Sequence, residues 1–374
     1  MTDREYMMRA IELAKRGVGA VDPNPLVGAV IVKDGEIIGE GWHAKYGDLH
    51  AERNAIKNLT KSAEGATIYV TLEPCCHHGK QPPCTDALLE NKIARVVIGS
   101  RDPNPLVSGK GAAILRDHGV TVEEDFMRDE CDELNPVFFH YITTKTPYVV
   151  MKYAMTADGK IATHTGASRW ITGDASRQRV QEMRYTYKGI MAGIGTVLAD
   201  DPMLNVRIEG KRSPIRIICD STLRIPEDCN IVKTASQYKT IIACALDDNE
   251  IAADKDLKSK ADLLKSCGVE IICAKSTDGK IDLKLLMKLL GEKGINSILL
   301  EGGGTLNESA LRSGIVNEVK AFIAPKIFGG ADARTPVEGG GVSLPSEAYA
   351  LKLNSIEPIG DDILLNYKVI NTLP

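Results

Sequence analysis

The sequence predicts an α/β protein that is built from two domains. Its 374 residues exceed what one core of ordinary size holds, and 43% of them are hydrophobic while 26% are charged, as in globular chains. Helical and strand-like segments alternate along the chain, and the alternation restarts after a polar, proline-ended stretch at residues 143–147. We therefore expect one domain over residues 1–145 and another over residues 146–374.

The first domain is expected to be a sheet sandwiched between helices. Thr2 and Glu5 form a capping-box pattern ahead of apolar residues at helical spacing, which predicts a first helix. Lys33-Asp34-Gly35 separates two short apolar runs and is typical of a hairpin turn. The later segments are a helix at about 50–58, a strand at 67–71, a helix at 84–91, a strand at 95–99 and a helix at 111–118.

The second domain is expected to contain a mainly parallel sheet. Short runs rich in branched apolar residues suit strands that are buried on both faces. They cover residues 148–154, 189–193, 215–219, 240–245, 269–273 and 297–300. Gly193-x-Gly195 and Gly302-Gly303-Gly304 can bind phosphate through backbone N–H groups, although tight turns are the commoner use of such glycines. Neither completes a dinucleotide fingerprint, so a Rossmann domain is not predicted.

Charge and composition argue against several classes of protein. The chain has 46 basic and 50 acidic residues and a formal net charge of −4, which does not predict general binding to nucleic acid or anionic membranes. No apolar run approaches the roughly 18 residues that cross a bilayer, and the first residues do not resemble a secretion signal. Nine cysteines, odd in number and irregularly spaced, indicate a reducing compartment, so we expect a cytoplasmic protein.

Three residues form a pattern that is typical of zinc ligands. His50 lies 25 residues before Cys75, and Cys84 follows nine residues later. One imidazole and two thiolates leave the fourth tetrahedral position for water, which zinc activates at neutral pH. Glu52 lies two residues after His50, and we expect it to be the catalytic acid and base of a hydrolytic deamination. Helix N-termini at His50 and Cys84 would favour the anionic thiolate.

Other interpretations of this pattern stay open. A closed structural zinc site would need a fourth protein ligand, and Cys76, His77 or His78 could supply one. A His-x-Glu tripeptide alone also arises by chance, although the cysteines behind it argue against chance here. The usual zinc-deaminase signature has two residues between its cysteines, whereas this chain has eight. We expect that polar insert, residues 76–83, to face the substrate.

The first domain resembles the deaminase half of the bifunctional riboflavin-biosynthesis deaminase–reductases. The motifs are His-Ala-Glu, then Glu-Pro-Cys-x-His-x-Gly-Lys-x-Pro-Pro-Cys, with Asp-Pro-Asn-Pro at 22–25 and 102–105. The resemblance implies a cytidine-deaminase-like α/β/α fold. Cys76 stands where the family usually has a small hydroxyl residue, and we expect Cys75, which follows proline, to bind zinc. The resemblance also implies substrate contacts by Asn24, His43, His77, Lys80, Asp102 and Asn104. Without it, the two asparagines before proline would be interpreted as turn residues.

The second domain resembles the reductase half of the same family, whose fold is similar to that of dihydrofolate reductase. The resemblance runs from about residue 147 to the end, through Lys152-Tyr153-Ala154-x-x-x-Asp158-Gly159-Lys160, Ser168-x-Trp170, the segment 193–207 and Leu300-Glu301-Gly302-Gly303-Gly304-x-Leu306-Asn307. It implies NADPH contacts by Ala154, Trp170, Thr196, Asp200, Ser221, Gly303, Gly304, Thr305, Leu306 and Asn307. It implies substrate contacts by Ser168, Arg184, Leu204, Arg207 and Glu301.

The chemistry of three residues adds to this resemblance. Arg184 and Arg207 are suited to paired, charge-assisted hydrogen bonds with a phosphate. Arg184 by itself, on a helix with other charged residues, would be interpreted as part of a solvated face. Lys152 lies on an otherwise apolar strand, where an unpaired buried charge is costly, so we expect it to reach the sugar or the phosphate of the substrate.

Together these features predict two consecutive reactions. The first is zinc-dependent hydrolytic deamination of 2,5-diamino-6-(5-phosphoribosylamino)pyrimidin-4(3H)-one, and the second is NADPH-dependent reduction of the ribosyl side chain to ribityl. The expected partners are these small molecules and further copies of the chain in a dimer or tetramer, with no nucleic acid or membrane. A nucleic-acid deaminase is disfavoured by the 5% aromatic content and negative charge. A non-catalytic zinc scaffold predicts that Glu52→Gln has no effect.

Overall fold

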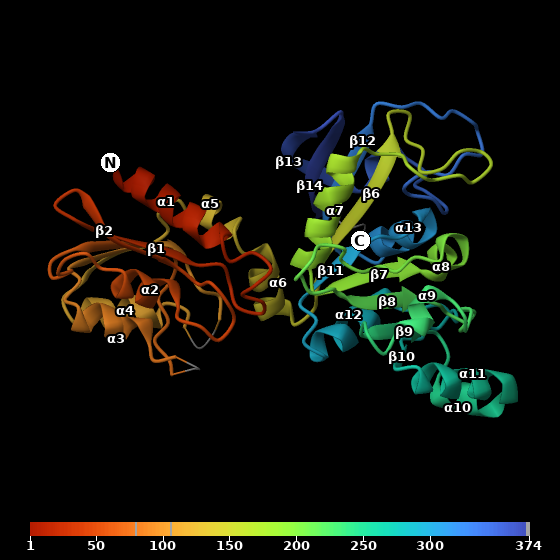
Figure 1. Ribbon diagram of the computed structural model, residues 1–374, viewed down its shortest axis with the longest axis horizontal. Helices are drawn as coiled ribbons and strands as arrows, with labels where there is room; N and C mark the ends of the chain where they lie inside the picture. The colour runs from red at the N-terminus through yellow and green to blue at the C-terminus, as the bar shows by residue number, and fades with distance from the viewer. Residues whose placement is uncertain (79–80, 105–106, 372–374) are drawn as a thin grey trace. The chain divides into compact units, whose positions relative to one another are not determined.

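The computed structural model describes residues 1–78, 81–104 and 107–371. The chain divides into two compact units, Met1–Lys145 and Thr146–Pro374, and each has its own sheet (Figure 1). Lys80, one of the expected substrate contacts, lies outside the described residues. Within the described part of the chain, no helix has the length and apolar character needed to cross a membrane.

A five-stranded mixed sheet forms the centre of the first unit. The strands are β1 (Gly28–Lys33), β2 (Glu36–Trp42), β3 (Thr67–Leu72), β4 (Arg95–Ser100) and β5 (Thr121–Glu123), in the order β2-β1-β3-β4-β5. β1 is antiparallel to β2 and β3, whereas β3, β4 and β5 are parallel. The predicted hairpin is confirmed, because Lys33 pairs with Glu36 across the turn.

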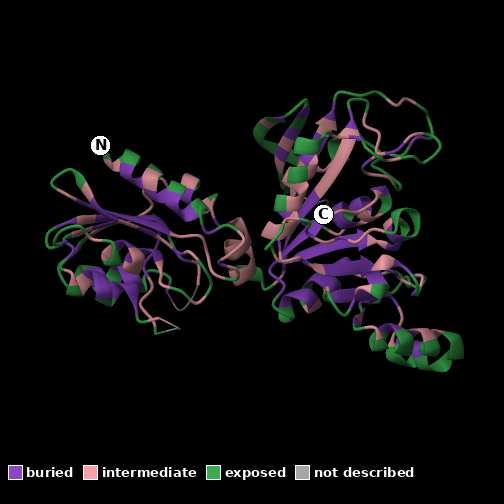
Figure 2. Ribbon diagram, viewed as in Figure 1, coloured by how far each residue is buried: buried purple, intermediate pink, exposed green. Residues whose placement is uncertain are grey.

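Helices cover both faces of this sheet, as expected from the sequence. They are α1 (Asp3–Lys15), α2 (Ala51–Lys57), α3 (Cys84–Glu90), α4 (Lys110–Asp117), α5 (Arg128–Asp132) and α6 (Pro136–Thr144). Met7 of α1 and Cys131 of α5 belong to a buried cluster on one face. Ala55 of α2, Leu88 of α3 and Leu115 of α4 belong to the cluster on the other face. The three central strands, β1, β3 and β4, are almost entirely buried between these layers (Figure 2).

A nine-stranded sheet forms the centre of the second unit. The strands are β6 (Tyr148–Thr156), β7 (Gly189–Gly193), β8 (Ile215–Cys219), β9 (Thr240–Cys244), β10 (Val269–Cys273), β11 (Ser297–Leu300), β12 (Val316–Ala324), β13 (Ala350–Ile359) and β14 (Asp362–Asn371). Their order is β10-β9-β8-β7-β11-β6-β12-β14-β13. The first seven in this order are parallel, which confirms the predicted sheet. The antiparallel β13–β14 hairpin was not predicted.

Helices also pack on both faces of the second sheet. They are α7 (Asp174–Thr186), α8 (Ile194–Asp200), α9 (Asn230–Lys233), α10 (Asp248–Ala253), α11 (Lys255–Ser266), α12 (Leu283–Glu292) and α13 (Gly304–Arg312). Leu286 of α12 and Leu311 of α13 belong to one buried cluster. Val197 of α8, Ile231 of α9 and Leu264 of α11 belong to another. Both clusters join these helices to the strands of the nine-stranded sheet.

Candidate functional site

Three metal-ligating side chains meet near the carboxyl end of β3. His50 is the N-cap of α2, Cys75 follows β3, and Cys84 is the first residue of α3. His50 Nδ1 lies 3.4 Å from the Sγ atom of each cysteine, and the three donor atoms lie within 4.8 Å of one another. Because one imidazole and two thiols are the donors that zinc prefers, this group fits a zinc ion.

Backbone contacts hold the two cysteines of this group together. The N–H groups of Cys84 and Thr85 donate to the carbonyl oxygen of Cys75 at 3.0 and 3.2 Å. The Cys84 N–H group also lies 3.4 Å from Cys75 Sγ. A hydrogen bond from the Cys84 thiol lowers the pKa of Cys75 to about 4 against the opposing effect of burial. The lowered pKa favours the thiolate form of Cys75, which is the form that binds metals.

The geometry gives no support to a closed four-ligand site. Among the residues that the structure describes, Cys76, His77 and His78 are not part of the ligand group. Cys75, rather than its neighbour Cys76, is the cysteine that lies beside His50. A site with three protein ligands leaves room for water, as in catalytic zinc sites.

Glu52 lies in the first turn of α2 and is 4% exposed. Burial, followed by the negative charge of Cys75, raises the pKa of Glu52 to about 7. A carboxyl group with a pKa near 7 can both accept and release a proton at neutral pH, which is what general acid–base catalysis requires.

A cavity of about 260 Å³ lies beside the ligand group. His50, Glu52 and Cys75 contribute to its wall. It is also lined by five residues that the resemblance implies as substrate contacts, namely Asn24, His43, His77, Asp102 and Asn104. Tyr46, Asp48, Glu73 and Phe138 also line the cavity and were not predicted as site residues. Gln81 lines it too and belongs to the insert that was expected to face the substrate.

Hydrogen bonds orient several side chains of the cavity. His43 Nδ1 lies 3.1 Å from the carbonyl oxygen of Leu49, which can only accept, so Nδ1 carries the hydrogen. His43 Nε2 then accepts from Nδ2 of Asn24 at 3.1 Å. Burial lowers the pKa of His43, in agreement with a neutral ring. Asp102 Oδ1 accepts the N–H group of Asn104 at 2.8 Å, while burial raises the pKa of Asp102 to about 6.

A second group of charged side chains, which is largely buried, lies in the second unit. Glu301 follows β11, Arg184 is in the last turn of α7, and Lys152 is in β6. The Arg184 guanidinium donates to both Glu301 carboxylate oxygens, at 2.7 and 3.0 Å, and Lys152 Nζ lies 3.7 Å from Oε2. The Arg184 side chain is only 11% exposed, so its interpretation as part of a solvated helix face is wrong.

The charges of this group depend on one another. Burial by itself would raise the pKa of Glu301, but Arg184 and then Lys152 outweigh burial and lower the pKa to about 2. Burial also lowers the pKa of Lys152, and Glu301 opposes this effect. With Glu301 ionised and both cations charged, the group carries one excess positive charge, which suits an anionic ligand.

Most residues that the resemblance implies as NADPH contacts lie in or shortly after adjacent parallel strands. Ala154 lies in β6, and Ser221 comes shortly after β8. Thr196 and Asp200 are in α8, which follows β7, and the 303–307 segment begins α13 after β11. The carboxyl ends of parallel strands are the usual ligand-binding edge of such sheets.

The remaining expected residues of this site lie in loops. Trp170 is 58% exposed and has the Arg177 guanidinium 4.8 Å from its ring centroid. Ser168 is half-buried, Leu204 is buried, and Arg207 is exposed. The two arginines expected to bind phosphate thus differ in their surroundings. Arg184 is largely buried and ion-paired with Glu301, whereas Arg207 is exposed.

Comparison with known proteins identifies a family for each unit. A family described as the cytidine and deoxycytidylate deaminase zinc-binding region matches residues 1–100, and the RibD C-terminal domain matches residues 147–365. The riboflavin biosynthesis protein RibD of Actinobacillus pleuropneumoniae is 55% identical over 373 residues, which are 100% of this chain and 97% of that protein. This chain belongs to the RibD family.

Solved RibD structures share the whole fold. RibD of Acinetobacter baumannii (form 1) is 36% identical with a TM-score of 0.84, and the match covers 99% of both chains. A deaminase/reductase from Thermotoga maritima is 38% identical with a TM-score of 0.82, and the match covers 98% of both chains. The predicted fold class, with a deaminase-like domain followed by a RibD reductase domain, is confirmed.

Family membership also confirms the predicted activities and cofactors. The chain is a bifunctional deaminase and reductase of riboflavin biosynthesis, and it uses Zn²⁺ and NADPH. Its reactions act on small molecules. The alternatives of a nucleic-acid deaminase and a non-catalytic zinc scaffold do not agree with this membership.

Proposed function

We propose that the first unit removes the 2-amino group of 2,5-diamino-6-(5-phosphoribosylamino)pyrimidin-4(3H)-one. The second unit then reduces the ribosyl side chain of the product to ribityl. The observation that carries the proposal is the cavity in which three ligating side chains, the buried Glu52 and several polar side chains come together.

The three zinc-ligating residues and Glu52 have different roles in deamination. His50, Cys75 and Cys84 would hold the zinc ion, which when bound activates water for attack on the ring carbon. The Glu52 carboxylate accepts a proton from the attacking water and gives it to the ring nitrogen. It then assists proton transfer to the leaving amino group, which departs as ammonia. Its pKa of about 7 suits both directions of transfer.

The other cavity residues would bind and orient the pyrimidine. Asn24, Asp102 and Asn104 offer the amide and carboxyl groups that match the donors and acceptors of a pyrimidine edge. His43 supports this role through its hydrogen bond to Asn24. Lys80 remains the candidate for the substrate phosphate.

The second site would combine a cofactor region with a charged substrate region. NADPH supplies the hydride for C1′ of the opened sugar. Lys152, Arg184 and Glu301 form a buried group with excess positive charge, and we assign it to the sugar and phosphate of the substrate. Ser168, Leu204 and Arg207 complete the proposed substrate contacts. The cofactor is assigned to Ala154, Trp170, Thr196, Asp200, Ser221 and the 303–307 segment.

We further propose a homo-oligomer in the cytoplasm. All nine cysteines are free, which suits a reducing compartment. β13 is an edge strand whose Leu353 and Ile356 side chains are 46% and 59% exposed. Exposed apolar side chains on a long edge strand favour association with another chain.

Replacement of Glu52 by Gln tests the deaminase assignment. Because the variant cannot shuttle protons, we expect ammonia release to fall about 100-fold or more. Zinc content and NADPH-dependent reduction of the deaminated substrate should not change. Glu12→Gln, at an exposed position of α1, is the control and should retain full activity. A Glu52→Gln protein that deaminates at the unaltered rate would contradict the assignment.

A further inference from the structure

Glu73 belongs to the Glu-Pro-Cys motif but has no part in the proposed chemistry. It directly follows β3, is 4% exposed and lines the cavity. A buried carboxylate is costly unless it is hydrogen-bonded or paired, so its contacts indicate what it does.

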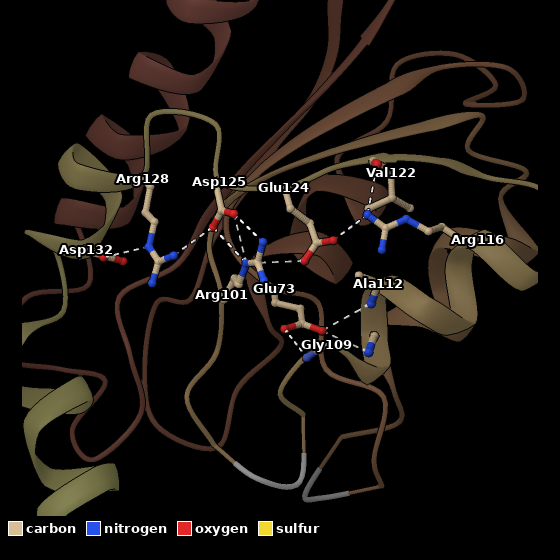
Figure 3. A network of polar contacts seen from close by, with 11 residues as sticks. Glu73, Arg101, Gly109, Ala112, Arg116, Val122, Glu124, Asp125, Arg128 and Asp132 are labelled. Atoms are coloured by element: carbon tan, nitrogen blue, oxygen red, sulfur yellow. Dashed lines mark hydrogen bonds and ion pairs between the residues drawn. The ribbon is translucent and has the colours of Figure 1, made fainter.

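The Glu73 carboxylate accepts backbone N–H groups at the start of α4 (Figure 3). Oε2 accepts from Gly109 at 3.0 Å, and Oε1 accepts from Gly111 and Ala112 at 3.1 and 3.3 Å. A carboxylate at this position satisfies N–H groups that have no partner within the helix, and it complements the helix dipole. Because both oxygens accept backbone N–H groups, the contacts of Glu73 are those of a residue that holds structure.

Glu73 also contacts the strand that precedes this helix. Its backbone N–H group donates to the carbonyl oxygen of Ser100, the last residue of β4, at 3.0 Å. Ser100 and Gly109 are the two ends of the segment that carries Asp102 and Asn104. A single residue therefore holds both ends of a segment whose polar side chains line the cavity.

Packing joins the same helix to the turn that leads into the ligand Cys75. A Cβ atom placed on Gly111 would lie 2.2 Å from the carbonyl oxygen of Pro74 and 3.3 Å from Glu73 Oε1. The first turn of α4 thus rests directly on Glu73 and Pro74, with no space for a side chain between them.

We propose that Glu73 is a positioning residue of the deaminase site. It holds Ser100 and Gly109, which lie on either side of Asp102 and Asn104 in the chain, relative to the turn that carries Cys75, so that these two side chains meet the substrate in the required geometry. The inference rests on the proposed function, which assigns substrate contacts to these two residues. Loss of Glu73 should therefore weaken productive substrate binding without removing zinc.

Glu73→Gln in the full chain is the main test. The glutamine amide keeps one acceptor oxygen but turns its NH₂ group toward an N–H donor. We expect KM of the deaminase substrate to rise about tenfold, with zinc content unchanged. Amide hydrogen exchange at residues 107–112 should become faster. The rate at which the same chain reduces the deaminated substrate should not change. This rate serves as the control that the variant is folded.

Two further variants make the test specific. Gly111→Ala keeps Glu73 but displaces α4 from Pro74, and it should raise KM in the same direction. Arg116→Ala, also on α4, removes an exposed ion pair with Glu124 (Figure 3) and should leave KM unchanged. An unchanged KM in Glu73→Gln overturns the proposal, whatever the KM of Gly111→Ala. Loss of zinc from Glu73→Gln also overturns the proposal, because the rise in KM would then come from a disturbed zinc site at Cys75.

Asp102→Asn distinguishes failure of this inference from failure of the proposed function. If Asp102→Asn raises KM while Glu73→Gln does not, the substrate assignment stands and the role of Glu73 is wrong. If Asp102→Asn leaves KM unchanged, the substrate assignment fails and the role of Glu73 falls with it. A rise in KM in both variants, with zinc retained, supports the proposal.

Discussion

At the scale of single residues, buried charges in this protein have partners that come from distant parts of the chain. Arg184 and Glu301 form a two-point ion pair, with Lys152 nearby. Removing one partner from such a pair leaves an uncompensated buried charge, which costs about 3–5 kcal/mol. A lysine at position 184 could not reproduce the two parallel hydrogen bonds of the guanidinium group. The pair therefore constrains the second site in both charge and geometry.

Ionisation of Glu301 should make the free energy of unfolding of the second unit depend on pH in the acidic range. Its pKa lies at about 2 in the folded protein, below the ordinary value of 4.5. The stability that its ionised form contributes is therefore fully present above pH 4.5 and is lost as the pH falls through about 2. We expect the free energy of unfolding to fall more steeply over this pH window in the unaltered protein than in Glu301→Gln.

Urea unfolding at a series of pH values measures this difference. Glu209→Gln, at an exposed position of the same unit, is the control and should follow the unaltered protein. Parallel pH profiles for the unaltered protein and Glu301→Gln would contradict the prediction.

At the scale of elements, acidic side chains hold the beginnings of two helices. Glu73 holds α4, and Asp362 holds α7. Asp362 is the first residue of β14, and its Oδ2 accepts the N–H group of Gly173 at 2.8 Å and the hydroxyl of Ser176 at 2.6 Å. Because the last turn of α7 carries Arg184, the β13–β14 hairpin helps to place a residue of the proposed reductase site.

Asp362→Ala should destabilise the second unit. The variant leaves the buried Ser176 hydroxyl and the Gly173 N–H group without their partner, and we expect a loss of about 1–3 kcal/mol in the free energy of unfolding. Reduction should slow as well, because α7 is less firmly held. The exposed neighbour provides a control, and Asp361→Ala should unfold at the unaltered urea concentration. If both variants unfold alike in urea, the Asp362 contacts do not stabilise the helix.

At the scale of the whole molecule, each unit has its own packed interior. The four clusters of buried apolar residues each lie within one unit, two in Met1–Lys145 and two in Thr146–Pro374. The ligand group and its cavity belong to the first unit, and the Arg184–Glu301 pair belongs to the second. Deamination and reduction can therefore be altered separately by substitution.

We predict that copies of this chain associate with one another through β13. We expect Ile356→Lys to convert the oligomer to a species with the mass of one chain, because it places a charge on an exposed apolar edge. Size-exclusion chromatography with light scattering measures the mass. Leu263→Lys, an exposed apolar position on α11, should leave the oligomer intact. An Ile356→Lys protein with the mass of the unaltered assembly would contradict the role of β13.

Local patterns in the sequence predicted most of the elements around the two sites. The capping box of α1 forms as expected between Thr2 and Glu5. Every strand that was predicted in the second domain is present, because apolar, β-branched runs of this length suit a buried parallel strand. β13 was missed because most of its residues are exposed and it lacks a buried apolar run. α6 was missed because most of this short segment is apolar, so its apolar residues follow one another instead of recurring at the helical spacing that marks an amphipathic helix.

The sequence by itself determined the class of fold and the two activities, and it predicted which three residues would bind zinc. Zinc chemistry requires particular donor types, and those residues stand in short motifs that can be identified without a structure. Only the tertiary structure decided which side chains meet. It paired Arg184 with Glu301, which is 117 residues away, and it placed Glu73 between β4 and α4. Such contacts and the pKa shifts that follow depend on burial and on neighbours distant in sequence, which local patterns do not contain.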